Sequence, residues 1–179
     1  MYIKRRYKMY IKGLIINYNK YLENKIIGEW IKFPIKDEAL QQVFKRIGLL
    51  WSDEIKDNLY IFYDWKCSFA HDFNAYETIE AMNYYANQLK FWDERKFLAA
   101  CECWDAKTPL NLGPHMFELY SELHDEESLG KYFANKFVNF HNNETLEKYF
   151  DFERYGKDVV LSMNGRFTNY GFIRPLQSK

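Results

Sequence analysis

Two short segments contain residue types that could do chemistry. Cys67, His71 and Asp72 are the types of a nucleophile, a base and an orienting acid, but their Cys-x3-His-Asp spacing matches no catalytic geometry that we can justify. Cys101 and Cys103 could supply two thiolates to zinc, although a structural zinc site normally has four ligands, usually with Cys-x2-Cys spacing. We therefore expect no catalytic residue, no metal site and no cofactor.

The basic start of the chain could bind nucleic acid. The segment YIKRRYKMYIK interleaves tyrosine with lysine and arginine, a pattern that holds single-stranded nucleic acid by stacking and charge. The simpler interpretation is a solvated terminus, since Lys4, Arg5, Arg6 and Lys8 all precede Met9, where the patterned sequence begins. We expect direct contact with nucleic acid, if any, through this basic first third.

Acidic residues dominate the rest of the chain. Residues 1–56 carry 12 Lys/Arg and 6 Asp/Glu, whereas residues 57–179 carry 13 and 19, so the net charge of zero hides an uneven distribution. Such a surface usually keeps a protein in solution, but a row of carboxylates could also occupy a DNA-binding groove, because duplex DNA presents about one charge per 1.7 Å. The candidate target-binding residues are Asp93, Glu94, Glu102, Asp105, Glu118, Glu122, Asp125, Glu126, Glu127, Glu144, Glu147, Asp151 and Glu153.

Four aromatic residues near the end of the chain are candidates for a homodimer contact. Tyr149, Phe150, Phe152 and Tyr155 recur at helical spacing and are too many for one face of a small core. Aromatic residues are enriched at protein interfaces. The alternative is a well-filled core, and the spacing alone does not decide between the two.

The sequence pattern predicts an α+β fold, whose strands and helices must position these residues. MYIKGLIINYN and KIIGEWIKFPI read as two antiparallel strands, and LYIFYDW as a third. Between them, DEALQQVFKRIGLL places apolar residues at helical spacing and ends at Gly48. Residues 1–65 are thus expected to form a β-β-α-β domain with a basic extension at 1–8.

The rest of the chain predicts a helical centre and a second α+β domain. Residues 66–112 contain two segments with apolar residues at helical intervals, and TPLNLGPH is the strongest linker signal. In residues 113–179 we expect a strand at MFELYSEL, helices at DEESLGKYFANKFV and NNETLEKYFDFERYG with Asn143 as a cap, and strands at DVVLSM and RFTNYGFIR. Gly156, Gly165 and Gly171 mark points where the backbone could turn.

The expected compartment is a reducing cytoplasm. No apolar run approaches the roughly 18 residues that cross a bilayer, and the basic start leads only to the short patch GLII, which is no signal peptide. Three cysteines are too few and too oddly placed for a disulfide framework.

Three segments resemble the ArdA-type antirestriction proteins. INYNKYLENKIIGEWIKFPIKDEALQQVFKRIGL has the family's Tyr-Asn, its Gly-x-Trp strand and a Phe-Pro ending before an acidic helix. YIFYDWKCSF occupies the place of the family's Asp-Tyr strand end. YFDFERYGKDVVLSMNGRF is similar to the family's Tyr-Gly-Arg/Lys-Asp-Leu segment, which a Ser-Gly-containing turn and a Gly-x-Phe strand follow. The resemblance extends from Met9 to about Ile173.

The resemblance implies an elongated three-part molecule, often a homodimer joined through its C-terminal domain. Such proteins are non-catalytic mimics of bent DNA that block type I restriction-modification enzymes on behalf of phages and other mobile genetic elements. The family is strongly acidic, whereas this chain is neutral with a basic first third. Fold is therefore inherited more safely than target.

Two alternatives of other classes follow from the basic first third. One is an anti-CRISPR protein that binds an RNA-guided nuclease or damages its guide RNA. For RNA cleavage, Glu23 or Glu29 beside lysines would be the first candidate, although no spacing identifies a site. The other is a structural or regulatory protein that binds nucleic acid through the Lys/Arg/Tyr arm.

Overall fold

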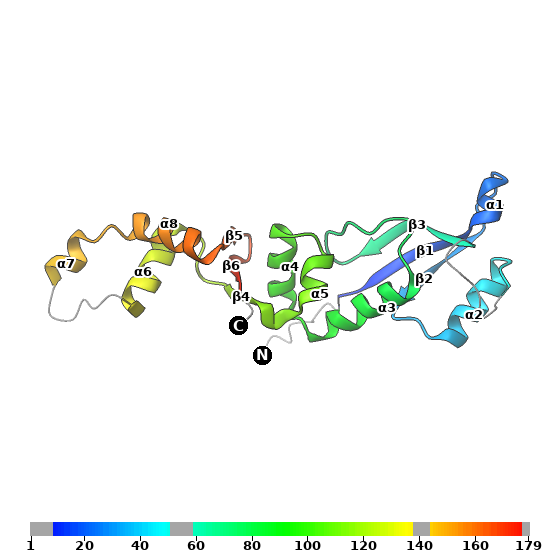
Figure 1. The fold of residues 1–179 in the computed structure, drawn as a ribbon, viewed down its shortest axis with the longest axis horizontal. Coiled ribbons are helices and arrows are strands. Elements are labelled where there is room, and N and C mark those ends of the chain that lie inside the picture. Colours follow the sequence, from blue (N-terminus) through cyan, green and yellow to red (C-terminus); the bar gives the residue numbers. More distant parts are fainter. Residues whose placement is uncertain (1–8, 51–58, 138–143, 177–179) are drawn as a thin grey trace, which may run out of the picture. The chain divides into compact units, whose positions relative to one another are not determined.

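The computed structural model describes residues 9–50, 59–137 and 144–176, which divide between two compact units, one up to Phe91 and one from Trp92. Each unit combines a three-stranded antiparallel sheet with helices (Figure 1). The α+β class is therefore confirmed. The division into domains at 1–65, 66–112 and 113–179 stays a prediction. The basic extension at 1–8 and the cap at Asn143 lie outside the described residues.

The sheet of the first unit has the strand order β2-β1-β3, and all its pairs are antiparallel. Its strands confirm the three predicted from the sequence: β1 (Ile11–Asn17), β2 (Gly28–Phe33) and β3 (Tyr60–Cys67). The Asn/Lys-rich connection after β1 contains a short helix, α1 (Tyr18–Leu22), which the sequence did not predict. The Asn17 side chain caps α1 by accepting a hydrogen bond from the Lys20 amide at 3.1 Å.

Helices cover one face of this sheet (Figure 1). They are α2 (Asp37–Arg46), α3 (Ile79–Gln88) and the 3₁₀ turn η1 (Leu89–Phe91). The predicted α2 is confirmed, with its apolar residues buried and a stop at Gly48, whose φ of +76° suits glycine. An aromatic cluster built around Phe62, whose ring is tilted against that of Trp65 with centroids 4.4 Å apart, fills the space between sheet and helices.

The sheet of the second unit has the strand order β4-β6-β5. Its strands are β4 (Phe117–Tyr120), β5 (Arg166–Thr168) and β6 (Gly171–Pro175). The helical elements are α4 (Glu94–Cys103), α5 (Lys107–Leu112), η2 (Pro114–Met116), α6 (Glu126–Phe137), α7 (Glu144–Tyr149) and α8 (Phe152–Met163). The segment that the sequence marks as a linker thus folds as α5 and η2, and its Pro109 and Leu110 are buried.

One strand prediction is wrong. The segment DVVLSM, expected to be a strand, forms the second half of α8. Tyr155, Val159, Val160 and Met163 all contact one core. A helix places all four on one side, whereas a strand would turn the neighbours Val159 and Val160 to opposite faces. The expected single helix before it is interrupted, since α7 ends at Tyr149 and Asp151 caps α8.

Two glycines allow α6 and α8 to cross closely. A Cβ at Gly130 would overlap the carbonyl oxygen of Phe152, and a Cβ at Gly156 would overlap the carbonyl oxygen of Glu126. Gly156 was expected at a turn, but it lies inside α8, because the crossing needs a residue without a side chain there. Gly171 does occupy a turn, with φ of +117° at the start of β6.

Candidate functional site

The thirteen candidate carboxylates all lie in the second unit, and four of them are aspartates directly before or two residues before the start of a helix. Each of these aspartates accepts a hydrogen bond from a backbone amide three residues later, at 2.7 to 3.1 Å. This arrangement satisfies a donor that the first helical turn would otherwise leave unpaired. We call these four the capping aspartates: Asp93, Asp125 and Asp151 stand directly before α4, α6 and α8, and Asp105 stands two residues before α5, where Ala106 holds the cap position.

Hydrogen bonds favour the charged form of two of these carboxylates, Asp105 and Asp125. Hydrogen bonds from the Thr108 amide and hydroxyl lower the pKa of Asp105, and those from Ser128 lower the pKa of Asp125. Hydrogen bonds to the charged form favour ionisation. Since all four side chains are also largely exposed, they present fixed negative charges to solvent.

Three further candidates form ion pairs. Glu127 pairs with Lys131 and Glu153 with Lys157, both one helical turn apart and exposed. The third, Glu118 on β4, accepts two hydrogen bonds from Arg174 on β6, at 2.9 and 2.6 Å. Burial raises the pKa of Glu118, but the Arg174 guanidinium, the hydrogen bond with Tyr120 and the charge of Lys136 together outweigh it and hold that pKa below the usual value.

Glu102 connects α4 to the β5–β6 hairpin. Its two carboxylate oxygens accept hydrogen bonds from the backbone amide and the side-chain amide of Asn169, both at 2.9 Å. Nearby, the Arg166 guanidinium donates to the Cys103 carbonyl at 3.1 Å. Glu102 therefore has a structural contact in addition to its charge.

The other candidates have different degrees of exposure. Glu122 and Glu147 are exposed, and Glu94 and Glu126 are half-buried. The Glu144 side chain lies outside the described part of the chain. The acidic character of this span is predicted by its composition. The capping role of the aspartates was not predicted, although an Asp just before a helical pattern is a recognisable signal in the sequence.

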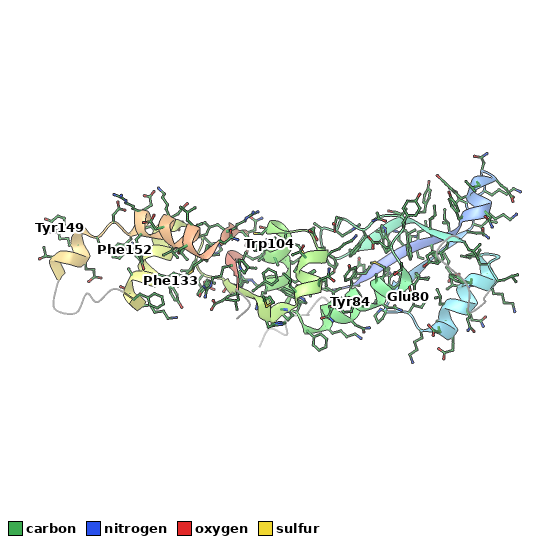
Figure 2. The ribbon with its side chains drawn as sticks, in the orientation of Figure 1. Glu80, Tyr84, Trp104, Phe133, Tyr149 and Phe152 are labelled. Atoms are coloured by element: carbon green, nitrogen blue, oxygen red, sulfur yellow. The ribbon has the colours of Figure 1, made fainter. Side chains whose placement is uncertain are left out.

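The four aromatic candidates have two kinds of environment. Phe150 contacts both Phe152 and Tyr155, with ring centroids 5.1 and 5.5 Å apart, and Tyr155 also contacts the core of the second unit. Tyr149, by contrast, is 78% exposed (Figure 2). Three of the four thus pack within the chain, and the dimer contact stays a prediction.

The Cys67 thiol, considered above as a nucleophile, is not activated by its surroundings. Burial raises the pKa of Cys67 to about 12, which keeps the thiol protonated and poorly nucleophilic at neutral pH. The neighbouring His71 stacks on Phe73. Neither Cys101 nor Cys103 forms a disulfide, and within the described residues no three His, Cys, Asp or Glu side chains are grouped to hold a metal ion.

The two glutamates considered for RNA cleavage have other partners. Glu23 pairs with Lys20 and Lys25 at the surface. Glu29 accepts two hydrogen bonds from Arg46, both 2.7 Å, and these lower its pKa. In the described part of the chain, no helix is long and apolar enough to cross a membrane.

The fold and the candidate site together describe a class of protein. It is a small α+β protein whose described acidic residues cap helices, form ion pairs or lie at the surface. The family model "Antirestriction protein (ArdA)" matches residues 14–174. The chain therefore belongs to the ArdA antirestriction family. No curated protein sequence matches it.

Proposed function

We propose that this antirestriction protein inhibits a type I restriction-modification enzyme by occupying its DNA-binding groove with the carboxylates of the second unit. Family membership supports the antirestriction function. The mimicry and the type of target are our proposal. The protein would act in the bacterial cytoplasm, where the restriction enzyme meets incoming DNA.

The capping aspartates are the observation that carries the proposal. A DNA backbone presents negative charges at fixed positions, and a groove that binds it contains Lys and Arg at matching positions. A carboxylate held by a backbone amide, as at Asp125 with 2.7 Å to the Ser128 amide, has lost most of its freedom before binding. Less side-chain entropy is then lost when it meets a lysine or arginine.

The test removes charge while keeping the caps. Asn caps helices about as well as Asp, so the quadruple variant Asp93→Asn/Asp105→Asn/Asp125→Asn/Asp151→Asn should fold normally. We expect it to lose most of its inhibition of a purified type I restriction enzyme and to bind that enzyme with a weaker salt dependence. Duplex DNA should compete with the wild-type protein for the enzyme.

A matched control neutralises four exposed acids of the first unit. The variant Asp37→Asn/Glu38→Gln/Asp72→Asn/Glu80→Gln changes the net charge equally and should inhibit like the wild type. Equal inhibition by the wild type and the quadruple Asn variant, or equal loss in both variants, would contradict mimicry by the second unit.

We further propose that the protein is a homodimer in which Tyr149 lies at the contact. Its exposed ring is typical of an interface residue. Light scattering at tens of micromolar protein should give the mass of a dimer, and Tyr149→Asp should shift it toward a monomer. A monomeric wild type at that concentration would contradict this part of the proposal.

An RNA-guided nuclease is the second candidate target, and the lysines of the first unit favour it. Deletion of residues 1–8 distinguishes the two, because a DNA mimic does not need the cations Lys4, Arg5, Arg6 and Lys8. The protein starting at Met9 should retain full inhibition of the restriction enzyme. Loss of inhibition, or guide RNA shortened by the intact protein alone, would favour the second candidate.

A further inference from the structure

The first unit has a sheet face that its helices do not cover. Residues opposite one another in the antiparallel register share a face of the sheet. Ile11, Phe33 and Phe62 point toward the helices and are buried. The opposite face, which we call the outer face, carries Lys12, Leu14 and their partners on β2 and β3.

Three lysines form a row across the outer face. Lys12 on the central strand is paired with Lys32 on β2 and with Lys66 on β3. Strands lie about 4.8 Å apart, so the three Cα atoms span about 10 Å. In the described part of the chain, none of the three ammonium groups forms an ion pair. Like charges directly opposite one another destabilise a sheet, so the stability of the fold does not explain why three lysines lie in this row.

Aromatic rings flank this lysine row. Trp30 lies next to it on β2, paired with Leu14, and the Lys66 ammonium lies 4.4 Å from the centroid of the Trp30 ring. The Lys12 ammonium lies 5.6 Å from the Tyr10 ring. Asp64, also on the outer face and opposite Leu14, is the one acidic group among the residues so placed, which leaves an excess of two positive charges.

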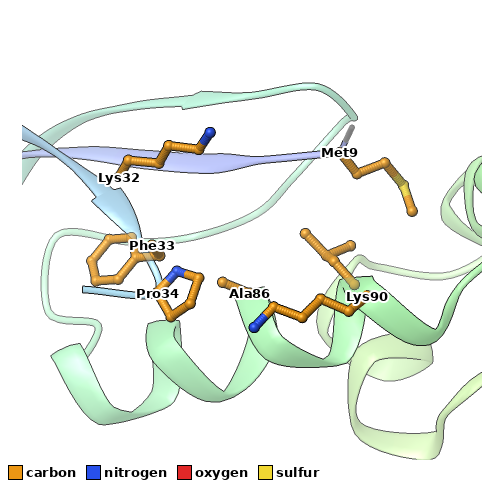
Figure 3. Close-up of a pocket in the computed structure, with 7 residues that line it drawn as sticks. Met9, Lys32, Phe33, Pro34, Ala86 and Lys90 are labelled. Carbon is orange, nitrogen blue, oxygen red and sulfur yellow. The ribbon is translucent and has the colours of Figure 1, made fainter. Parts of the chain in front are cut away.

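Lys32 also lines a hollow of about 200 Å³ between β2 and the helical elements α3 and η1 (Figure 3). Lys32 and Lys90 supply its cations. Pro34, Leu89 and Met9 supply apolar walls. A flat apolar group with an attached anion would therefore contact both the apolar walls and the lysine cations of this hollow.

We propose that the outer face of the first unit binds single-stranded nucleic acid, with the lysine row on the phosphates and Trp30 stacked on a base. The combination of a cationic track with aromatic platforms is what sequence-tolerant binding of single strands requires. Duplex DNA fits less well, because its bases are already stacked. The inference goes beyond the antirestriction function and uses none of the carboxylates of the second unit.

The experiment measures fluorescence anisotropy of labelled 20-nucleotide dT and U oligomers with the full-length protein at about 50 to 200 mM salt. The two oligomers separate DNA from RNA as the source of the phosphates. The wild type should bind with an affinity that falls as salt rises. The variant Lys32→Gln/Lys66→Gln should reduce the salt slope by about 1.4, since each contact with a single strand contributes about 0.7.

A matched control removes two exposed lysines elsewhere in the same unit. Lys36→Gln/Lys45→Gln changes the net charge equally but leaves the outer face intact, and it should bind like the wild type. Trp30→Leu should weaken binding about fivefold or more without changing the salt slope, because stacking releases no counterions. Circular dichroism melting checks that each variant is folded.

Three outcomes would overturn the proposal. The first is a wild type that binds neither oligomer at the lowest salt. The second is an equal effect of the two lysine pairs, which would mean that only net charge matters. The third is loss of binding on deletion of residues 1–8, which would assign the activity to the basic extension. The quadruple Asn variant of the second unit should keep its oligomer binding, so the two proposals can fail separately.

Discussion

Both units contain a three-stranded antiparallel sheet, but they begin their helices with different residues. In the first unit the capping side chains are neutral, from Asn17 at α1 and Thr78 at α3. In the second unit aspartates cap α4, α6 and α8, and Asp105 accepts a hydrogen bond from the first turn of α5. Asn, Asp, Ser and Thr cap about equally well, so folding does not demand the charge. The difference suggests that the second unit carries its aspartates for another reason as well.

The cores of the units also differ. The first is filled by aromatic side chains between the sheet and helices, as in the contacts of Phe62 with Phe33 and Trp65. In the second, Gly130 and Gly156 bring two helix backbones into direct contact. A side-chain core can adjust by small rotations, whereas a backbone contact has little freedom to move. The two units should therefore respond differently to small increases in volume.

The largest expected effect comes from Gly156→Ala. The added methyl would overlap the carbonyl oxygen of Glu126, and the free energy of unfolding of the second unit should fall by about 3 kcal/mol. Urea unfolding followed by circular dichroism would show the loss. The control Asp158→Ala, at an exposed position of the same helix, should change little. A similar small effect for both variants would mean that α6 and α8 do not cross as described.

Removal of a helix cap should give the next largest effect. It also tests whether the charge of a capping aspartate is needed for folding. Asp151→Ala should cost about 1 kcal/mol, and Asp151→Asn only a few tenths, because Asn still accepts the hydrogen bond from the Arg154 amide. Thr78→Ala in the first unit should cost about as much as Asp151→Ala. If Asp151→Asn destabilised the protein as much as Asp151→Ala, the charge itself would be needed for folding.

The smallest expected effect is the pH dependence of the Glu118–Arg174 pair. The pKa of Glu118 is lowered in the folded protein, so the pair stabilises above about pH 4.5, and this stability is lost as pH falls through the lowered pKa. Glu118→Gln should flatten the acid limb of a stability profile, by less than about 1 kcal/mol because the pair is partly exposed. Glu122→Gln is the control, and an unchanged acid limb in Glu118→Gln would contradict the assignment.

Elements with a strong local pattern were predictable from the sequence. The strands β1, β2 and β3 contain dense Ile, Tyr, Trp and Phe, and α2 has both an acidic first turn and apolar residues at helical spacing. The segment DVVLSM was misread because its β-branched valines favour a strand locally. Val159 and Met163 contact core residues that lie far away in the sequence, and these contacts override the local preference for a strand.

The sequence by itself determined the family and the α+β class of this protein. For the candidate site, it determined the concentration of carboxylates within residues 93–153. These depend on residue type and local order. Only the tertiary structure decided which carboxylates cap helices, that Gly156 lies at a helix crossing and that Lys12, Lys32 and Lys66 are neighbours. The three lysines are 20 and 34 positions apart along the chain, and strand register alone brings them together. Register follows from which face of each strand the whole core buries, so no local pattern contains it.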